Sequence, residues 1–281
     1  MEDFRTSKKE TVLDQYVELP VVHIKDGAKT PEDVPLIVEE PLEIRVNGLP
    51  YAVVMRTPGH EMELAAGFCL TEGIVDSFPD ILSMGFCPNE TEELKNIVQV
   101  IVKNAPQEGD SRPGPRAMSS RSSCGLCGVR MLEDIGRRLS RIEGGPEIKA
   151  EDLVRMQYAM LERQDLFRTT RGGAHAVALA DTGGKVIVVR EDLGRHNAMD
   201  KVIGHAMMSG IDCRRCVALI SGRISFEMVQ KAVRAKIAVV AAVSAATSLA
   251  VNLAERMGCT LVGRLRDRDM VVYTHSSRIL E

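Results

Sequence analysis

Alternation between apolar and polar side chains predicts two antiparallel strands near the start of the chain. Residues 36–55 follow this period of two on either side of Asn47-Gly48, a dipeptide that favours the tight turn of a β-hairpin. A short apolar run at residues 97–103 predicts one further strand. We expect these strands to flank a helix.

The residues between these strands follow a helical period. Thr57 and Pro58 supply an N-cap and a first-turn proline, and apolar residues then recur every three or four positions as far as Cys69. Cys69 is therefore expected on the apolar face of an amphipathic helix. Together these elements predict a small α/β region at residues 36–103, preceded by an N-terminal extension at residues 1–35.

The second half of the chain shows strands and helices in alternation, after two predicted helices at residues 128–142 and 151–167. The order is hairpin, helix, strand, helix, strand, helix and two closing strands, at residues 174–192, 197–210, 216–222, 225–236, 237–244, 248–258, 260–265 and 270–275. The continuous apolar run at residues 237–243 favours burial on both faces of a sheet. Residues 129–281 are therefore predicted to form an α/β domain, a three-layer sandwich with a mixed sheet.

The composition is that of an ordinary globular protein and narrows the range of partners. Of 281 residues, 44% are apolar and 27% are charged, and the net charge of -3 provides no general basic surface for nucleic acid. The first sixteen residues contain no apolar stretch typical of signal peptides. The apolar run at residues 237–251 is too short, and too interrupted by hydroxyl residues, to span a bilayer. We therefore expect a cytoplasmic protein that binds neither membranes nor bulk nucleic acid.

A pair of cysteines follows a segment that lacks the means to fold. Residues 104–123 contain three prolines, two glycines and five serines and almost nothing apolar, so burial cannot offset their ordering entropy. The sequence SSCGLCG then places Cys124 and Cys127 two residues apart, directly before a predicted helix. We therefore predict a mobile loop at residues 104–128 that carries the cysteine pair.

The position of Cys124 and Cys127 at a helix N-terminus favours reactive thiols, because the amides and dipole of a helix stabilise a thiolate there. The motif by itself fits thiol–disulfide exchange, metal capture or sulfur relay. A flexible tether favours the relay, since a carrier must reach a donor and then an acceptor. The odd number of cysteines, seven, argues against a disulfide framework.

A second pair, Cys213 and Cys216, lies too far along the chain from Cys127 for the usual spacing of a four-cysteine zinc site. Cys213 is expected in a loop, and Cys216 leads directly into a buried strand. For Cys124 and Cys127, a zinc half-site and two thiols without a function remain alternative interpretations. Cys213 and Cys216 are interpreted as loop and core residues.

Clusters of polar residues are expected at the carboxyl ends of strands, where open α/β sheets bind their ligands. Hydroxyl groups at helix starts can cradle anions, and arginines can grip phosphates. Ordinary N-capping hydroxyls and a structural histidine remain alternative interpretations. Together the clusters predict a pocket for a polyphosphate-bearing ligand, comprising His175, Arg195, His196, Asn197, Ser221, Arg223, Ser244, Thr247, Ser248, Arg264, Arg266 and Arg268.

Two metal-dependent hydrolase motifs are incomplete in this sequence. His60 begins a segment like that of zinc peptidases, but Leu64 stands where their second histidine is required. The zinc deaminase motif requires a glutamate two residues after its histidine and a proline before its cysteine pair. Here Val177 stands two residues after His175, in place of the glutamate, and Ser123 stands before the cysteine pair, in place of the proline. No metal site is therefore predicted.

Seven segments, in order from about Leu36 to the C-terminus, resemble the FdhD family of sulfurtransferases required for formate dehydrogenase activity. They are RTPGHEMELAAGF, SSCGLCG, GGAHAVAL, EDLGRHNAMDK, SGRISFEMVQK, SAATSLAVNLA and TLVGRLRDRDMVVYTH. Seven ordered segments are far more specific than one CxxC motif. The resemblance implies a fold similar to that of cytidine deaminase, without the zinc chemistry of that enzyme.

The resemblance also implies a sulfur relay. A cysteine desulfurase loads sulfur on the loop as a persulfide, and the protein passes it to the bis-molybdopterin guanine dinucleotide cofactor of formate dehydrogenase. Cys124 would carry the persulfide and Cys127 would assist its transfer or release. The competing interpretations of the pair are a thiol–disulfide oxidoreductase, which needs both cysteines, and a cofactor chaperone, which needs neither.

Members of this family bind the guanine dinucleotide in a pocket that includes a late segment, and they are dimeric. The matching segment here is Arg264, Leu265, Arg266, Asp267, Arg268 and Asp269. The sequence departs from the family pattern at Arg171, Ala246 and Arg264, where the family usually has Thr, Pro and an aromatic residue. An arginine at the last position retains the ability to stack on a purine.

Overall fold

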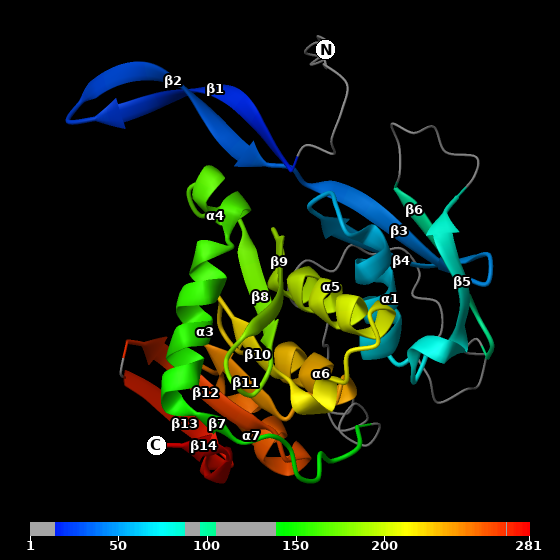
Figure 1. The fold of residues 1–281 in the computed structure, drawn as a ribbon. Coiled ribbons are helices and arrows are strands. Elements are labelled where there is room, and N and C mark those ends of the chain that lie inside the picture. The colour runs from blue at the N-terminus through cyan, green and yellow to red at the C-terminus, as the bar shows by residue number, and fades with distance from the viewer. Residues whose placement is uncertain (1–14, 88–95, 105–138, 268) are drawn as a thin grey trace.

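The computed structural model describes residues 15–87, 96–104, 139–267 and 269–281. Its centre is a six-stranded sheet of order β13-β12-β11-β10-β8-β9 (Figure 1). The three middle strands β10, β11 and β12 run parallel and the others pair antiparallel, so the sheet is mixed, as predicted. The strands are β8 (His175–Ala180), β9 (Val186–Asp192), β10 (Val217–Ile220), β11 (Val239–Ala242), β12 (Thr260–Arg266) and β13 (Asp269–Thr274).

Helices cover both faces of this sheet and confirm the predicted three layers. One face packs against α3 (Ala150–Glu162) through Leu153, Met156 and Met160. The other face packs against α5 (Arg195–Met208), α6 (Phe226–Arg234) and α7 (Ser248–Met257). All residues of β10 and β11 are buried, because apolar strands covered on both sides expose neither face to water.

The N-terminal region forms a second sheet, of order β4-β3-β6-β5. Its strands are β3 (Glu40–Val46), β4 (Leu49–Arg56), β5 (Ile81–Phe86) and β6 (Ile97–Val102). The predicted turn is confirmed, since Asn47 and Gly48 have positive φ angles between β3 and β4. Helix α1 (Glu61–Thr71) packs between this sheet and α5, with Cys69 fully buried as expected.

Helix α1 begins later than predicted. It starts at Glu61, after His60 in a left-handed conformation, so Thr57 is not its N-cap. Instead, the Thr57 hydroxyl accepts a hydrogen bond from the backbone N–H of Leu193, in a distant loop. The predicted helix at residues 151–167 is likewise divided into α3 and α4 (Asp165–Thr169), because the Glu191 carboxylate binds backbone N–H groups of α4.

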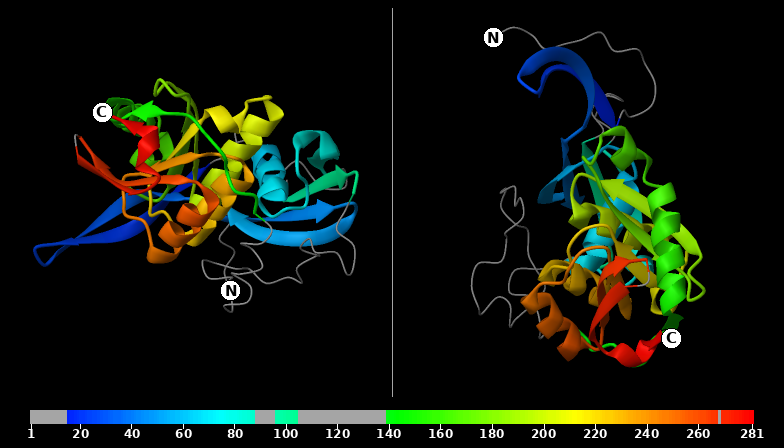
Figure 2. Two further views of the ribbon diagram at one scale, coloured as in Figure 1. Left: turned by 90° about the horizontal axis from the view of Figure 1, so that it is seen from below. Right: turned by 90° about the vertical axis from the view of Figure 1, so that its left-hand side faces the viewer.

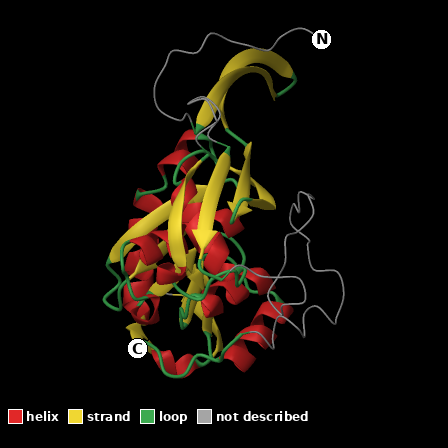
Figure 3. Cartoon of the chain, turned by 90° about the vertical axis from the view of Figure 1, so that its right-hand side faces the viewer, coloured by secondary structure: helices red, strands yellow, loops and turns green. Residues whose placement is uncertain are grey.

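A hairpin of β1 (Tyr16–Lys25) and β2 (Ala28–Ile37) stands away from the two sheets (Figures 2 and 3). It occupies much of the predicted N-terminal extension, for which no strand was predicted. An ion pair of 2.9 Å between Glu32 and Arg171 ties β2 to the segment before β8. Arg171, one of the departures from the family pattern, therefore fastens the hairpin to the body of the protein.

The remaining elements are short. They are β7 (Ile148–Lys149), β14 (Ile279–Leu280) and three 3-10 turns at Phe78–Asp80, Cys213–Arg215 and Ser276–Arg278. None of the helices in the described part of the chain has both the length and the apolar character needed to cross a membrane.

A buried ion pair links three of the helices. The Asp200 carboxylate of α5 accepts hydrogen bonds from Lys231 Nζ of α6, at 2.7 and 2.9 Å, and from the Thr71 hydroxyl of α1, at 2.8 Å. Burial raises the pKa of Asp200, and the charge of Lys231 acts in the opposite direction. The ionised form of Asp200 therefore depends on the positive charge of Lys231 beside it.

Replacing Lys231 with methionine should lower the free energy of unfolding by about 3–5 kcal/mol, because the Asp200 carboxylate is left unpaired. The double variant Asp200→Asn with Lys231→Met should lose less, because neither buried group is then charged. Urea unfolding of both variants measures the difference. Equal losses in the two variants would show that the charge of Asp200 is not the source of the cost.

Candidate functional site

The polar clusters predicted from the sequence meet at one edge of the six-stranded sheet. Because β10, β11 and β12 are parallel, their carboxyl ends lie at the same edge and carry Ser221, Ser244 and Arg264 into it. Strand β8 runs antiparallel to β10 and therefore starts there, at His175. His175 pairs with Asp192 at the end of β9. We call the edge formed by these five residues the ligand edge.

Backbone hydrogen bonds join the loops along the ligand edge. The Ser221 N–H donates to the Ala176 carbonyl at 3.0 Å, and the Ala176 N–H donates to the Ser221 hydroxyl at 2.9 Å. The Arg264 N–H donates to the Ser244 carbonyl at 3.0 Å, and Arg264 itself has a φ of 54°. The loops are thus fixed relative to one another.

Three helices start beside this edge, and two of them lack a capping side chain. Helix α5 follows Gly194 and α6 follows Ser225, and neither residue caps its helix through a side chain. In α7, by contrast, the Thr247 hydroxyl accepts from the Ala250 N–H at 3.3 Å. The uncapped starts of α5 and α6 leave backbone N–H groups and the positive ends of two helix dipoles for an anion.

The starts of α5 and α6 are held together at a polar corner. His196 Nε2 of α5 lies 2.7 Å from a carboxylate oxygen of Glu227 in α6. Gly222 lies close to the side chains of this corner. A Cβ atom at its position would lie 3.3 Å from His175 Nδ1 and 3.9 Å from Arg195 Cδ. The corner is therefore lined by side chains from three different segments.

Apart from His196 Nε2, which lies in the ion pair with Glu227, two buried polar atoms in this corner have no hydrogen-bond partner among the residues that the structure describes. They are Nε of Arg195 and the hydroxyl oxygen of Ser225. Buried polar groups in folded proteins are nearly always paired. A donor and a hydroxyl left open beside two uncapped helix starts therefore indicate a place for a ligand rich in acceptor atoms.

The titratable side chains that line the corner differ in their charge near neutral pH. Burial lowers the pKa of His175, and the nearby charges of Arg195 and His196 lower it further. The hydrogen bond from His196 lowers the pKa of Glu227, so this carboxylate is ionised near neutral pH. Near neutral pH, His175 is therefore uncharged while Arg195 is the cation that can face an anionic ligand.

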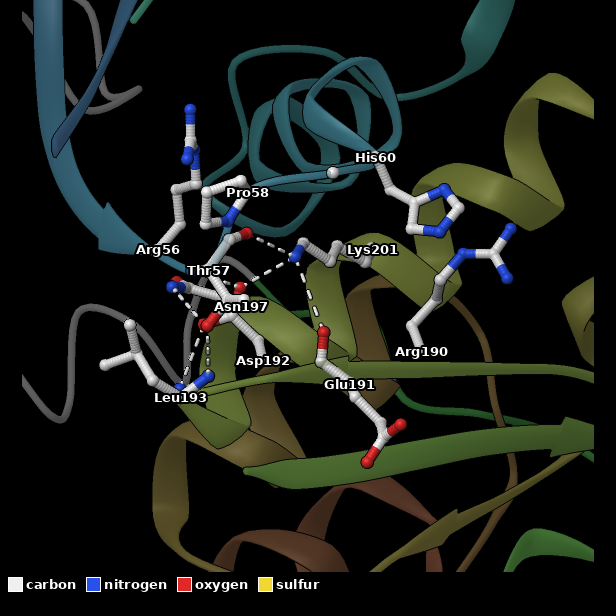
Figure 4. Close-up of polar contacts among 12 residues, drawn as sticks. Arg56, Thr57, Pro58, His60, Arg190, Glu191, Asp192, Leu193, Asn197 and Lys201 are labelled. Atoms are coloured by element: carbon white, nitrogen blue, oxygen red, sulfur yellow. Dashed lines mark hydrogen bonds and ion pairs between the residues drawn. The ribbon is translucent and has the colours of Figure 1, made fainter. Parts of the chain in front are cut away.

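A buried network behind the corner connects the ligand edge to the N-terminal sheet (Figure 4). Lys201 Nζ lies 2.8 Å from a carboxylate oxygen of Asp192 and donates to the Thr57 carbonyl at 3.0 Å. Asn197 donates to the Met55 carbonyl at 2.6 Å and to Asp192 at 3.0 Å. Asn197, predicted as a ligand contact, thus has its side-chain amide engaged within the protein.

The other predicted residues divide between the ligand edge and the body of the protein. Arg223 and Ser248 are exposed beside the edge, whereas the Thr247 hydroxyl is used as a helix cap. In the late segment, Arg264 lies at the edge, and the side chain of Leu265 is fully buried in the core that faces α3.

The rest of the late segment continues beyond the ligand edge. The Tyr158 hydroxyl of α3 donates to the Asp267 carboxylate at 2.5 Å. Arg266 and Asp269 face each other across the turn between β12 and β13. Arg268 lies outside the described residues. The structure therefore brings Arg264 to the ligand edge and carries its neighbours toward α3.

Four of the five described cysteines are poor candidates for reactive thiols. Burial raises the pKa of Cys69, Cys213 and Cys259 to about 12 and that of Cys216 to about 11. As predicted, Cys213 lies in a turn and Cys216 leads into β10. Within the described ranges, no group of three or more His, Cys, Asp or Glu side chains is arranged to hold a metal ion.

The predicted reactive pair, Cys124 and Cys127, lies outside the described residues, as do the loop that carries it and most of the helix predicted to follow. Two contributions to the corner were missed from the sequence: Glu227 as the partner of His196, and Thr57 as a support for the loop before α5. Both depend on contacts between segments far apart in the chain, for which a single sequence contains no signal.

A comparison with solved structures supports the fold. A solved structure from Desulfotalea psychrophila, assigned as a formate dehydrogenase accessory protein, has the same fold, with a TM-score of 0.76. It is 24% identical, and the match covers 95% of this chain and all of that one.

Two proteins named sulfur carrier protein FdhD are more similar in sequence. One, from Mycolicibacterium paratuberculosis, is 44% identical, with 92% of this chain and 97% of the relative matched. The other, from Streptomyces avermitilis, is 43% identical, with 92% and 94% matched. The sequence model of the FdhD/NarQ family matches residues 37–280, from the end of β2 to β14. The chain therefore belongs to the FdhD/NarQ family.

Proposed function

We propose that this protein is a sulfur carrier that supports the maturation of formate dehydrogenase, with Cys124 as the carrying residue. Its family membership and the name of its relatives, sulfur carrier protein FdhD, support this role. The cysteine chemistry agrees, because burial raises the pKa of Cys69, Cys213, Cys216 and Cys259. A thiol must ionise to attack sulfur, which disfavours these four residues. Of the remaining cysteines, Cys124 and Cys127 stand in the CxxC segment that resembles the family motif, whereas Cys87 does not.

In the proposed reaction, Cys124 acts first as a nucleophile and then as a donor. Its thiolate attacks the outer sulfur of a persulfide on a cysteine desulfurase, and the sulfur–sulfur bond of that donor breaks. The desulfurase leaves as a thiolate, and Cys124 becomes a persulfide. When the cofactor is bound, the Cys127 thiolate attacks Sγ of Cys124, a disulfide between the two cysteines forms, and the bond to the outer sulfur breaks. That sulfur leaves as hydrosulfide toward bis-molybdopterin guanine dinucleotide, the molybdenum cofactor of formate dehydrogenase, and a cellular thiol reductant restores the two thiols.

We propose that the ligand edge binds the phosphate and guanine portion of that cofactor. The observation that carries this proposal is the pair of open polar atoms, Arg195 Nε and the Ser225 hydroxyl oxygen, between two uncapped helix starts. Helix N-termini and arginines are the groups that proteins use to bind phosphates. Arg223, in the loop after β10, and Arg264, at the ligand edge, are both exposed and add positive charge.

Replacing Arg195 with alanine should weaken binding of GDP, used here as a probe of the nucleotide portion, by roughly 10- to 100-fold. This range corresponds to the loss of one hydrogen bond to a charged group. Isothermal titration calorimetry of the purified protein measures the effect. Arg214→Ala is the matched control, because Arg214 is paired with Asp212 before β10, at the opposite edge of the sheet.

The proposal for the pocket fails if wild-type protein does not bind GDP, or if the Arg195 variant binds it as tightly as wild type. The family resemblance adds three further parts to the proposal: a cytoplasmic location, a cysteine desulfurase as sulfur donor, and a homodimer. Light scattering on the purified protein measures the mass in solution and so tests the last of these.

A further inference from the structure

Thr57 belongs to the N-terminal region but is built into the start of α5. It is fully buried after β4, and three of its atoms make hydrogen bonds to the segment around Asp192. Its N–H donates to Asp192 at 3.2 Å, and its hydroxyl accepts from the Leu193 N–H at 3.1 Å. Its carbonyl accepts from Lys201 Nζ at 3.0 Å. Figure 4 shows these contacts converging on one point.

The loop before α5 has little local support of its own. The residue before the helix is Gly194, which has no side chain with which to cap it. The Asp192 carboxylate accepts from the Gly194 N–H at 2.9 Å, and Thr57 binds the intervening Leu193. The loop that leads into Arg195 and His196 is thus held by Asp192 together with a residue 136 positions before Leu193.

The network is closed and contains the polar groups needed to satisfy its members. Asp192 accepts four hydrogen bonds or ion pairs, from Thr57, Gly194, Asn197 and Lys201. Lys201 is fully buried and directs its ammonium group to Asp192 and to the carbonyls of Thr57 and Glu191. A fully satisfied buried network holds a single arrangement of the chain.

We propose that Thr57 is a positioning residue for ligand binding at the ligand edge. Its hydroxyl fixes the Leu193-Gly194 turn, and the turn places Arg195 and His196 in the corner with His175. This inference rests on the proposed nucleotide site. It adds that the N-terminal region, through one hydroxyl group, controls the affinity of a site built from the C-terminal domain.

Three variants separate a positioning role from a structural one. Thr57→Val removes the hydroxyl and keeps the side-chain volume, and Thr57→Ser restores the hydroxyl. Thr71→Val is the matched control, because Thr71 is a second buried threonine whose hydroxyl joins an ion pair involving α5. Its partner Asp200 lies within the helix, away from the loop that precedes it.

Two measurements are made on each variant at a temperature where circular dichroism shows it folded. One is GDP affinity by calorimetry, and the other is the set of histidine ring signals by NMR. We expect Thr57→Val to bind GDP about tenfold more weakly, Thr57→Ser to recover most of this loss, and Thr71→Val to bind as wild type does. If Thr57→Val does not fold, Thr57→Ala replaces it, since water can enter the space.

The inference is overturned if Thr57→Val binds GDP within about twofold of wild type while Arg195→Ala does not, or if Thr71→Val loses as much affinity. Failure of the proposed function gives a different result, namely no GDP binding by wild-type protein. For protein that does bind GDP, the histidine ring signals distinguish a positioning role of Thr57 from a structural one. Displacement of the His175 and His196 signals in Thr57→Val, but not in Thr71→Val, supports positioning, and unchanged signals in both exclude it.

Discussion

Replacement of Cys124 with alanine should abolish the activation of formate dehydrogenase, while GDP binding by the purified variant stays unchanged. The loss follows because Cys124 is the residue that carries the transferred sulfur in the proposed relay, with Cys127 acting only on its release. The ligand edge is assembled from residues after position 174, so it does not require the Cys124 thiol. The measurement is formate dehydrogenase activity in cells that lack their own family member and express the variant.

The control for this experiment is Cys213→Ala. Burial raises the pKa of Cys213 to about 12, and the residue lies in the turn before β10, at the opposite edge of the sheet from the corner. This variant should support formate dehydrogenase activity close to that of wild type. Full activity with Cys124→Ala would contradict the relay and favour a cofactor chaperone, which needs the pocket but neither cysteine of the pair.

Replacing Gly67 with alanine should lower the free energy of unfolding by about 3 kcal/mol or prevent folding. In α1, Gly67 faces α5, and a Cβ atom added there would lie 1.9 Å from the Asp200 carbonyl oxygen. Gly204 of α5 makes the reciprocal approach, with its Cβ position 1.8 Å from the Glu63 carbonyl oxygen. Backbone cannot move aside as a flexible side chain can, so the two helices would have to separate.

The sign of this effect makes it a sharp test, because alanine ordinarily stabilises a helix interior by up to about 1 kcal/mol relative to glycine. Gly85→Ala, in β5, serves as the control, since no atom lies within 4 Å of its Cβ position. Urea unfolding compares the two variants. A Gly67 variant as stable as wild type would show that α1 and α5 do not pack as closely as described.

The parts of the fold that follow local patterns could be predicted from the sequence. The β3–β4 hairpin follows from alternation around Asn47-Gly48, and the order of elements from β8 to β13 follows from their periods. The β1–β2 hairpin was missed, although Asp26-Gly27 is a turn signal of the same kind. Most of its residues are exposed on both faces, so it lacks the alternation by which a half-buried strand is recognised.

The ligand edge was predictable in outline for a topological reason. Parallel strands bring their carboxyl ends together, so Ser221, Ser244 and Arg264 were expected near one another before any contact was known. Which side chains are free for a ligand could not be predicted. Thr247 caps its own helix through the nearby Ala250 N–H, one of the two roles that its local sequence allowed. Asn197 binds the Met55 carbonyl, a partner that tertiary packing alone brings to it.

The same reason explains why Thr57 was assigned the wrong role. Its type and its position before Pro58 fit an N-cap, and nothing in the local sequence shows that Leu193 and Lys201 lie beside it. Buried tertiary hydrogen bonds outweighed the local preference, and α1 begins three residues later than predicted. The residues whose local signals mislead in this way are those that join the two sheets.

The central claim, that Cys124 carries sulfur, is tested most directly by mass spectrometry with peptide mapping. The purified protein is incubated with cysteine and an active cysteine desulfurase in the absence of reductant. The account predicts one additional sulfur atom on the peptide that contains Cys124, removed by dithiothreitol. A disulfide between Cys124 and Cys127 as the only product, or no change in mass, would contradict it.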